Sequence, residues 1–190
     1  MANTQKISTK RIVLTALMAA LTVVGSAIRI TIPLDIAGTT SFHLGNIFCA
    51  LSGILLGPGL GGAAAGLGSL IYDVIFYPAY ISECWITFLT KGAYGLVSGL
   101  IICAGSREWG YRKSLMATLA GALTYAALYL AKSYFYSGLL IHGLTPDAAW
   151  LTVIGKLPAT IFNVVVAVIC APMLANAIRS ALKKNHLTLD

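Results

Sequence analysis

Polar and ionisable side chains recur at helical spacing in three apolar segments of the second half of the chain. Each row contains one lysine, and the rows are Glu83, Thr87, Lys91 and Tyr94; Tyr125, Tyr129, Lys132 and Tyr136; and Thr152, Lys156, Thr160 and Asn163. Steps of three and four residues place the members of a row on one face of a helix. Burying a charge among apolar groups is costly unless the charge is paired. We therefore expect the three rows to face one another.

The chemistry that these rows favour is recognition of a small molecule. Aromatic rings stack on a flat ligand, while lysine, glutamate and asparagine side chains hold its polar edge. The predicted binding residues are Glu83, Trp85, Thr87, Lys91, Tyr125, Tyr129, Lys132, Lys156, Asn163, His43 and Asn46. The alternative is a structural ion-pair network, in which Lys91 or Lys132 pairs with Glu83 or Asp73. Both interpretations hold together if a paired lysine also lines the site.

Asp73, His43 and Asn46 precede these rows in the sequence. Asp73 lies close to Tyr72, Phe76 and Tyr77, and it suits either an intramembrane ion pair with a lysine or contact with the ligand. His43 and Asn46 are expected at the outer mouth of the pocket. For both of them, capping at the membrane interface is the alternative role.

Sequence patterns of catalysis are missing. The chain contains no GxSxG, HExxH or Walker A motif and no carboxylate pair at a useful spacing. The four cysteines fall inside apolar runs without a CxxC, so we expect small buried side chains and no metal site. We predict a non-catalytic protein with no cofactor of its own. Any active transport would then draw its energy from an ion gradient or from a partner.

Composition predicts the elements that position these residues. Of the 190 residues, 58% are hydrophobic and 10% are charged, and the mean hydropathy is +0.84. A soluble domain has about 25% charged residues, so the sequence predicts an integral membrane protein. Its apolar runs are long and do not alternate, which favours helices over barrel strands. The net charge of +7 does not indicate nucleic-acid binding, because the basic residues are scattered in small groups.

The expected fold is an all-α bundle of six transmembrane helices in a single membrane domain, residues 1–190. At roughly 20 residues per span, the expected spans are about 11–32, 43–57, 59–77, 83–105, 114–137 and 148–178. Residues 33–42 are expected to form a polar loop. The basic start of the chain also resembles a signal peptide, and cleavage after Ala27 is the alternative to a retained first helix.

Basic residues predict the orientation in the membrane. They cluster in the segments 6–11, 107–113 and 179–184, which six spans place on one side. The positive-inside rule makes this side cytoplasmic, with both termini inside a bacterial cytoplasmic membrane. Arg29 lies near the outer end of the first expected span, where we expect its side chain to snorkel towards the interface.

Small residues recur at positions where helices touch. Gly62 with Gly66 and Gly95 with Gly99 form GxxxG pairs, which predict close contact within the bundle. Ala16 and Ala20 form an AxxxA pair on the first span. This pair suits internal packing and contact with a partner's helix equally well.

Together these features resemble the substrate-binding S components of energy-coupling factor (ECF) vitamin transporters. The resemblance is carried by six spans in this length, by Ala16 and Ala20, and by the segment FHLGNIFCALSGILLGPGLGGAAAGLGSLIYD. It implies a subunit that binds a vitamin or precursor from outside and works with a transmembrane coupling protein and two cytoplasmic ATPases. In such proteins the alanine motif contacts the coupling protein, and the first outer loop and spans four to six form the pocket. The subunit is thought to topple in the membrane to deliver its ligand.

The resemblance is strongest to members assigned to hydroxymethylpyrimidine, the thiamine precursor, or to pyridoxine. The tyrosines and Trp85 suit a flat ring, whereas the lysines equally suit a carboxylate such as pantothenate; riboflavin is a further alternative. Two other functions compete. One is a proton-driven secondary transporter using Asp73 or Glu83, although no inverted repeat is evident. The other is a small membrane enzyme, for which no nucleophile–base pair is found.

Overall fold

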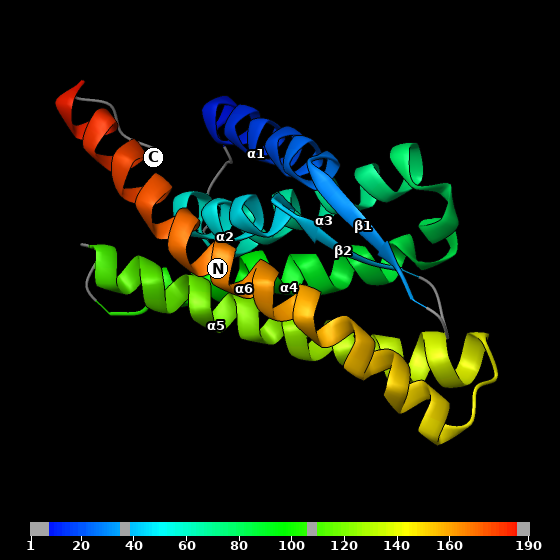
Figure 1. Cartoon of the computed structure of the whole chain (residues 1–190). Coiled ribbons are helices and arrows are strands. Elements are labelled where there is room, and N and C mark those ends of the chain that lie inside the picture. The colour runs from blue at the N-terminus through cyan, green and yellow to red at the C-terminus, as the bar shows by residue number, and fades with distance from the viewer. Residues whose placement is uncertain (1–7, 35–38, 106–109, 186–190) are drawn as a thin grey trace, which may run out of the picture.

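The computed structural model describes residues 8–34, 39–105 and 110–185. In chain order the elements are α1 (Thr9–Ala27), β1 (Arg29–Pro33), β2 (Thr39–His43), α2 (Gly45–Leu56), α3 (Pro58–Phe76), the 3-10 helix η1 (Pro78–Glu83), α4 (Cys84–Cys103), α5 (Tyr111–Ala131), the π-helical segment η2 (Lys132–Ile141) and α6 (Pro146–Lys184). Figure 1 shows the two longest helical stretches, α5 with η2 and α6, running beside the shorter helices. The short helix α2 contacts each of the other α-helices and is therefore the centre of the bundle.

Within the described residues, five helical stretches are long and apolar enough to cross a membrane. They are Thr9–Ala27, Pro58–Phe76, Ile81–Cys103, Tyr111–Ile141 and Pro146–Lys184. The remaining α-helix, α2, has 12 residues and is too short to belong to this set. Most of its side chains are buried against the surrounding helices, so the protein and not lipid forms its environment.

Local sequence signals account for several helix ends. The Ser8 hydroxyl accepts a hydrogen bond from the backbone N–H of Arg11 at 3.4 Å and so caps α1. Thr145 caps α6 in the same way, and Pro146 occupies its first position. Gly57 adopts a φ of 80°, which a side chain disfavours, and it separates α2 from α3 in a tight connection.

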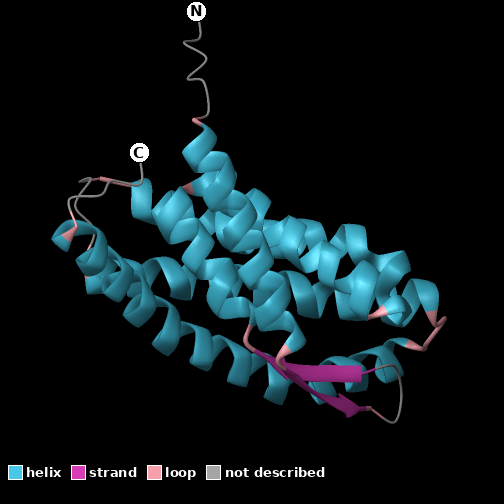
Figure 2. Cartoon of the chain, turned by 90° about the horizontal axis from the view of Figure 1, so that it is seen from above, coloured by secondary structure: helices cyan, strands magenta, loops and turns pink. Residues whose placement is uncertain are grey.

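The segment after α1 differs from the expected continuous first span and polar loop. The helix ends at Ala27, and Arg29–Pro33 pairs with Thr39–His43 as an antiparallel hairpin. The segment from Ile30 to Ile32 consists of β-branched residues, which favour extended backbone, and Pro33 disfavours helix in the residue before it. Figures 1 and 2 show the hairpin against the helices at one edge of the bundle.

Two later spans also extend beyond their expected ends. The fifth helix continues past residue 137 as η2 and reaches Ile141, and α6 runs to Lys184 instead of about 178. Hydropathy marks only the apolar part of a helix. The last turn of α6 carries Lys183 and Lys184, and basic side chains favour a helix C-terminus.

Glycines allow the helices to approach at the level of the backbone. A Cβ added at Gly62 would lie 3.0 Å from the carbonyl oxygen of Gly92, and one at Gly95 would lie 2.6 Å from that of Gly61. Added Cβ atoms at Gly66 and Gly99 would also press on neighbouring backbone. The structure thus confirms that both GxxxG pairs pack inside the bundle.

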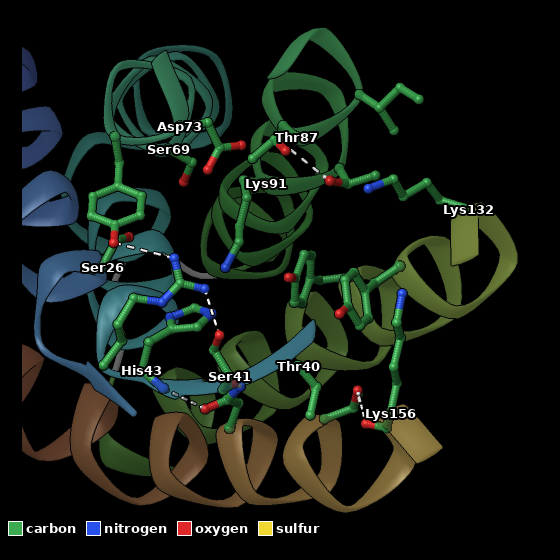
Figure 3. A pocket seen from close by; sticks show the side chains of 18 of the residues that line it. Ser26, Thr40, Ser41, His43, Ser69, Asp73, Thr87, Lys91, Lys132 and Lys156 are labelled. Atoms are coloured by element: carbon green, nitrogen blue, oxygen red, sulfur yellow. Dashed lines mark hydrogen bonds between the residues drawn. The ribbon is translucent and has the colours of Figure 1, made fainter. Parts of the chain in front are cut away.

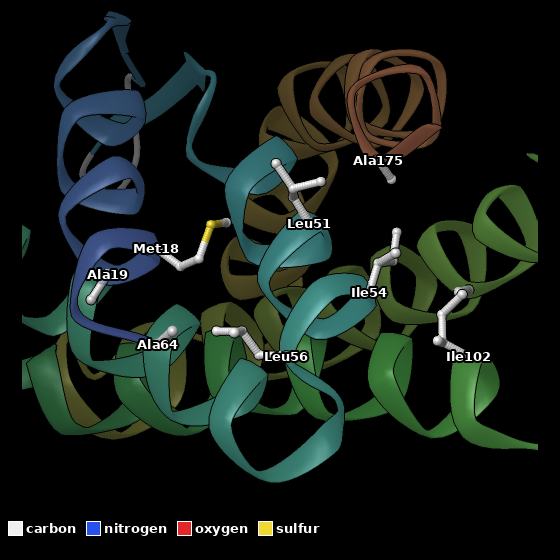
Figure 4. Packing of buried hydrophobic residues seen from close by; sticks show 9 residues of the cluster. Met18, Ala19, Leu51, Ile54, Leu56, Ala64, Ile102 and Ala175 are labelled. Carbon is white, nitrogen blue, oxygen red and sulfur yellow. The ribbon is translucent and has the colours of Figure 1, made fainter. Parts of the chain in front are cut away.

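A buried apolar cluster fills the end of the bundle away from the hairpin. It includes Met18 of α1, Leu51 and Leu56 of α2, Ala64 of α3 and Ala175 of α6 (Figure 4). At the other end, polar residues take the place of this apolar core.

Candidate functional site

A pocket of about 100 Å³ lies between the hairpin and helices α3 to α6. Figure 3 shows its polar side chains converging from several elements. The lining residues are Ser26, Arg29, Thr39, Thr40, Ser41, His43, Ser69, Tyr72, Asp73, Ile86, Thr87, Thr90, Lys91, Tyr125, Tyr129, Lys132, Lys156, Thr160 and Asn163. Eight of the eleven predicted binding residues therefore line this pocket, and the three that do not are Glu83, Trp85 and Asn46.

The three lysines of the sequence rows come from different elements and border the same hollow (Figure 3). Lys91 of α4 is buried, donates to the side-chain oxygen of Asn46, and has its ammonium 4.1 Å from the centre of the Tyr125 ring. Lys156 of α6 donates to the hydroxyl of Ser133 at 3.2 Å. The packing of α4, η2 and α6 thus brings together charges that are far apart in the sequence.

Tyrosine rings form a continuous stack along one wall. The Tyr94 and Tyr125 rings lie 5.9 Å apart, and the Tyr125 and Tyr129 rings lie 5.8 Å apart, with small interplanar angles in both pairs. Tyr94 is fully buried beneath the pocket, whereas Tyr125 and Tyr129 line it. The wall therefore offers both an apolar ring surface and hydroxyl groups to a small ligand.

Glu83 is buried but does not line the pocket. Its carboxylate pairs with the Lys132 ammonium and accepts a hydrogen bond from the Ser137 hydroxyl at 3.0 Å. These contacts join η1, where Glu83 is the last residue, to η2, where Lys132 is the first. The ion-pair interpretation is thus confirmed for Glu83 and Lys132, and Lys132 also lines the site.

Comparison with known proteins decides the family. Residues 6–180 match the family model described as "ECF-type riboflavin transporter, S component". The chain belongs to this family. It is also similar to a protein of Pyrococcus woesei described as "Uncharacterized protein in gap 3'region", with 32% identity over 119 residues, which are 63% of this chain and 74% of that protein.

The family match shows that the pocket lies in a substrate-binding subunit of a transporter. ECF S components are substrate-binding subunits of vitamin transporters and not enzymes, and they work with a coupling protein and ATPase subunits. The apolar helices and the family together identify a multi-pass membrane protein. In this S component, the pocket is a polar site enclosed by membrane helices and the hairpin.

Arg29 does not snorkel towards the interface as expected. It lines the pocket of the S component, where its Nη1 donates to the Tyr72 hydroxyl at 3.2 Å and its Nη2 donates to Ser41 Oγ at 2.6 Å. Its guanidinium carbon also lies 4.8 Å from the centre of the Tyr77 ring. The prediction was wrong because Arg29 begins a strand, and pairing with β2 directs its side chain inwards.

Trp85 likewise does not contribute to the pocket. Its side chain is 52% exposed and packs edge-on against the Tyr136 ring at 6.0 Å. Two residues along an α-helix correspond to a rotation of about 200°, so Trp85 lies almost opposite Thr87. Tyr136 is also absent from the lining residues. Both rings lie on the outer surface of the S component.

Asn163 serves the hairpin as well as the pocket. Its side-chain oxygen accepts a hydrogen bond from the backbone N–H of His43 at 3.0 Å, and its Nδ2 donates to the carbonyl oxygen of Ser41 at 2.8 Å. Both groups of the amide are therefore occupied by β2. Asn163 holds the strand against α6, and this contact closes one side of the site.

His43 and Asn46 are not helix caps in this structure. The N-cap of α2 is Leu44, and no side chain caps this end. Asn46 is buried behind the lining residues, where its oxygen accepts the Lys91 ammonium. Burial lowers the pKa of His43 well below 6.5, and the charges of Lys91 and Arg29 lower it further. His43 is therefore neutral at neutral pH.

Asp73 lines the pocket on α3, next to Thr87 of α4. The charges of Lys91, Lys132 and Arg29 all act on its carboxylate. The intramembrane ion pair and ligand contact both stay predictions for this residue.

The three rows of polar residues did not predict the lining residues on the hairpin side of the site. Arg29, Thr39, Thr40 and Ser41 come from the strands, and Ser69 and Tyr72 come from the same helix as Asp73. A signal for the strands was present: β-branched residues at 30–32 and the run of hydroxyls at 39–41 are separated by turn residues. For Ser69 and Tyr72, spacings of four and one from Asp73 were the only local indication.

Proposed function

We propose that this S component captures a water-soluble vitamin or vitamin precursor from outside the cell and delivers it through the membrane. A transmembrane coupling protein and two cytoplasmic ATPases would supply the energy. The observation that carries the proposal is a polar, charged pocket enclosed within the apolar helices of a member of the S-component family. Buried charges are expensive in such a setting and are typical of functional sites.

The size of the pocket supports a compact ligand. Its volume of about 100 Å³ is below the roughly 300–1,000 Å³ that is usual for sites of drug-sized ligands. Hydroxymethylpyrimidine and pyridoxine contain a single ring, and pantothenate is a narrow chain. Riboflavin, which the family description names, has three fused rings and a sugar-alcohol chain. We therefore favour a compact ligand, such as hydroxymethylpyrimidine, pyridoxine or pantothenate, over riboflavin.

The outer face of α1 supports a docking surface for the coupling protein. Ala16 and Ala20 are exposed on this face, and Leu17 beside them is 52% exposed, whereas Met18 and Ala19 point into the bundle. Small side chains let a partner's helix approach closely in a membrane. Neither alanine is among the lining residues of the pocket, so a partner's helix on this face would leave the pocket free.

Tryptophan at both Ala16 and Ala20 should weaken assembly with the coupling protein. The bulky rings would hold a partner's helix away from α1, and we expect recovery of the complex to fall by about tenfold or more. Copurification from membranes that contain the S component, the coupling protein and the ATPases measures this loss. The control is Met116→Trp on α5, where the side chain is already 64% exposed. An equal recovery of the complex from both variants would show that α1 is not the docking face.

Uptake assays test the transport function itself. Cells that contain the S component and the coupling module should accumulate the labelled vitamin, whereas cells with an ATPase that cannot hydrolyse ATP should not. Accumulation in vesicles that contain the S component alone would instead identify a secondary transporter, driven by an ion gradient. Orientation is measured in the same cells by labelling single cysteines at the termini, which we propose are cytoplasmic.

A further inference from the structure

Positive charge exceeds negative charge in the pocket. Four cationic residues line it, namely Arg29, Lys91, Lys132 and Lys156, whereas Asp73 is the only carboxylate among the described lining residues. Glu83, just outside, is paired with Lys132. Asp73 can balance only one of the other three cations, so at least two positive charges have no matching carboxylate in the site.

The hydrogen bonds of these cations show the same imbalance. Lys91 donates to the neutral amide of Asn46, and Lys156 donates to the neutral hydroxyl of Ser133. Arg29 donates to two hydroxyls, and its Nε is buried without a hydrogen-bond partner. The Nδ1 atom of His43 is also buried without a partner. Buried charges in proteins are normally paired with an opposite charge, so the site is rich in donors and poor in anionic acceptors.

The donors that face no carboxylate are close together. The charges of Arg29 and Lys91 act on each other, and both act on His43. Figure 3 shows Lys91, His43 and Ser41 around one hollow, and Arg29 is hydrogen-bonded to Ser41 there. This end of the pocket lies next to the face of Tyr125, which Lys91 covers.

We propose that the ligand of this S component is an anion, and that its carboxylate or phosphate group binds between Arg29 and Lys91. This inference rests on the proposed function and narrows its substrate class. A guanidinium group binds the planar oxygens of a carboxylate or phosphate in a bidentate manner, and an ammonium group adds a point charge. The rest of a compact ligand would then lie along Tyr125 and Tyr129. Neutral hydroxymethylpyrimidine and pyridoxine would leave the cations unmatched, whereas a carboxylate such as pantothenate would balance them.

Binding of matched probe pairs to the purified S component tests the charge of the ligand. The carboxylate pairs are pantothenate with pantothenol and nicotinate with nicotinamide, and the phosphate pair is pyridoxal phosphate with pyridoxal. Hydroxymethylpyrimidine is the neutral single-ring probe, and thiamine is the cationic one. We expect thermal stabilisation by at least one anion, with binding roughly ten- to hundredfold tighter than that of its neutral partner. The pair that shows this preference also distinguishes a carboxylate from a phosphate.

Variants then locate the anion. Arg29→Gln and Lys91→Met should each weaken binding of the preferred anion by roughly ten- to hundredfold, and should therefore reduce the preference for this anion over its neutral partner. Arg29→Lys keeps the charge and should restore part of the preference if the fold is intact. Lys183→Gln removes one positive charge from the exposed end of α6 and is the matched control.

The outcomes separate the inference from the proposed function. Binding of a neutral or cationic probe as tight as that of every anion, or the absence of stabilisation by any anion, would overturn the inference. An unchanged preference in both Arg29→Gln and Lys91→Met would overturn the assigned position. These measurements need no coupling protein, so anion binding without ATP-dependent uptake would contradict only the proposed function.

Discussion

Leucine in place of Gly61 is expected to prevent the bundle from packing, whereas leucine in place of Gly59 is expected to be tolerated. A Cβ at Gly61 would lie 2.5 Å from the Cα atom of Gly53 and 2.5 Å from the carbonyl oxygen of Ser52. These atoms belong to the backbone of α2 and cannot rotate away. A Cβ at Gly59 would meet no atom within 4 Å. The two glycines are two residues apart in the same helix, so they form a closely matched pair.

The expected cost at Gly61 is about 3 kcal/mol or more, at or above the usual range for overpacking. Many proteins have a total stability of only about 5–15 kcal/mol, so the variant should yield little monodisperse protein. Size-exclusion chromatography in detergent and the thermal unfolding midpoint measure the effect. Equal yields and midpoints for Gly61→Leu and Gly59→Leu would show that α2 and α3 are not in backbone contact at this position.

The second large effect is expected from Lys132→Met. This change removes the cation that pairs with Glu83 and leaves the carboxylate buried with the hydroxyl of Ser137. Breaking a buried pair by removal of one partner costs about 3–5 kcal/mol. The two side chains are only 13% and 12% exposed, so solvent offers little compensation. We expect a clear drop in the thermal unfolding midpoint and looser contact between η1 and η2.

A double-mutant cycle tests whether the loss comes from the stranded charge. Glu83→Gln combined with Lys132→Met removes both charges and should recover most of the stability. Lys184→Met, at the exposed end of α6, removes a lysine that lies outside the bundle and should change little. If the double variant is as unstable as the sum of the two single variants, the pair does not act as a unit.

The sequence alone was sufficient to predict the class of the protein and one wall of the site. A low content of charged residues and long apolar runs required membrane helices. The spacing of Lys91, Lys132 and Lys156 among polar residues placed each on one helix face, and the structure brings those faces together. Such predictions succeed because helical periodicity is local: residues three and four apart share a face whatever the rest of the chain does.

Apart from His43, the tertiary structure decided which residues form the other wall. The segment of β-branched residues at 30–32 is apolar enough to be taken for the end of a membrane span. Only the pairing of Thr31 with Ser41 shows that it is a strand. This pairing turns Arg29 from an expected interface residue into a lining residue. Rotation about the helix axis, set by packing against neighbours, directed Trp85 outwards.

The physical reason is the range of the interactions involved. The preference of apolar segments for the membrane and the spacing of residues along a helix depend on residues that are near in the sequence. The composition and the pattern of the sequence are therefore enough to predict them. Strand register, the balance of buried charges and the fit of glycines against distant backbone depend on residues that meet only in the folded bundle. The apolar helices of this S component follow from the first kind of interaction, and the cationic pocket between hairpin and helices follows from the second.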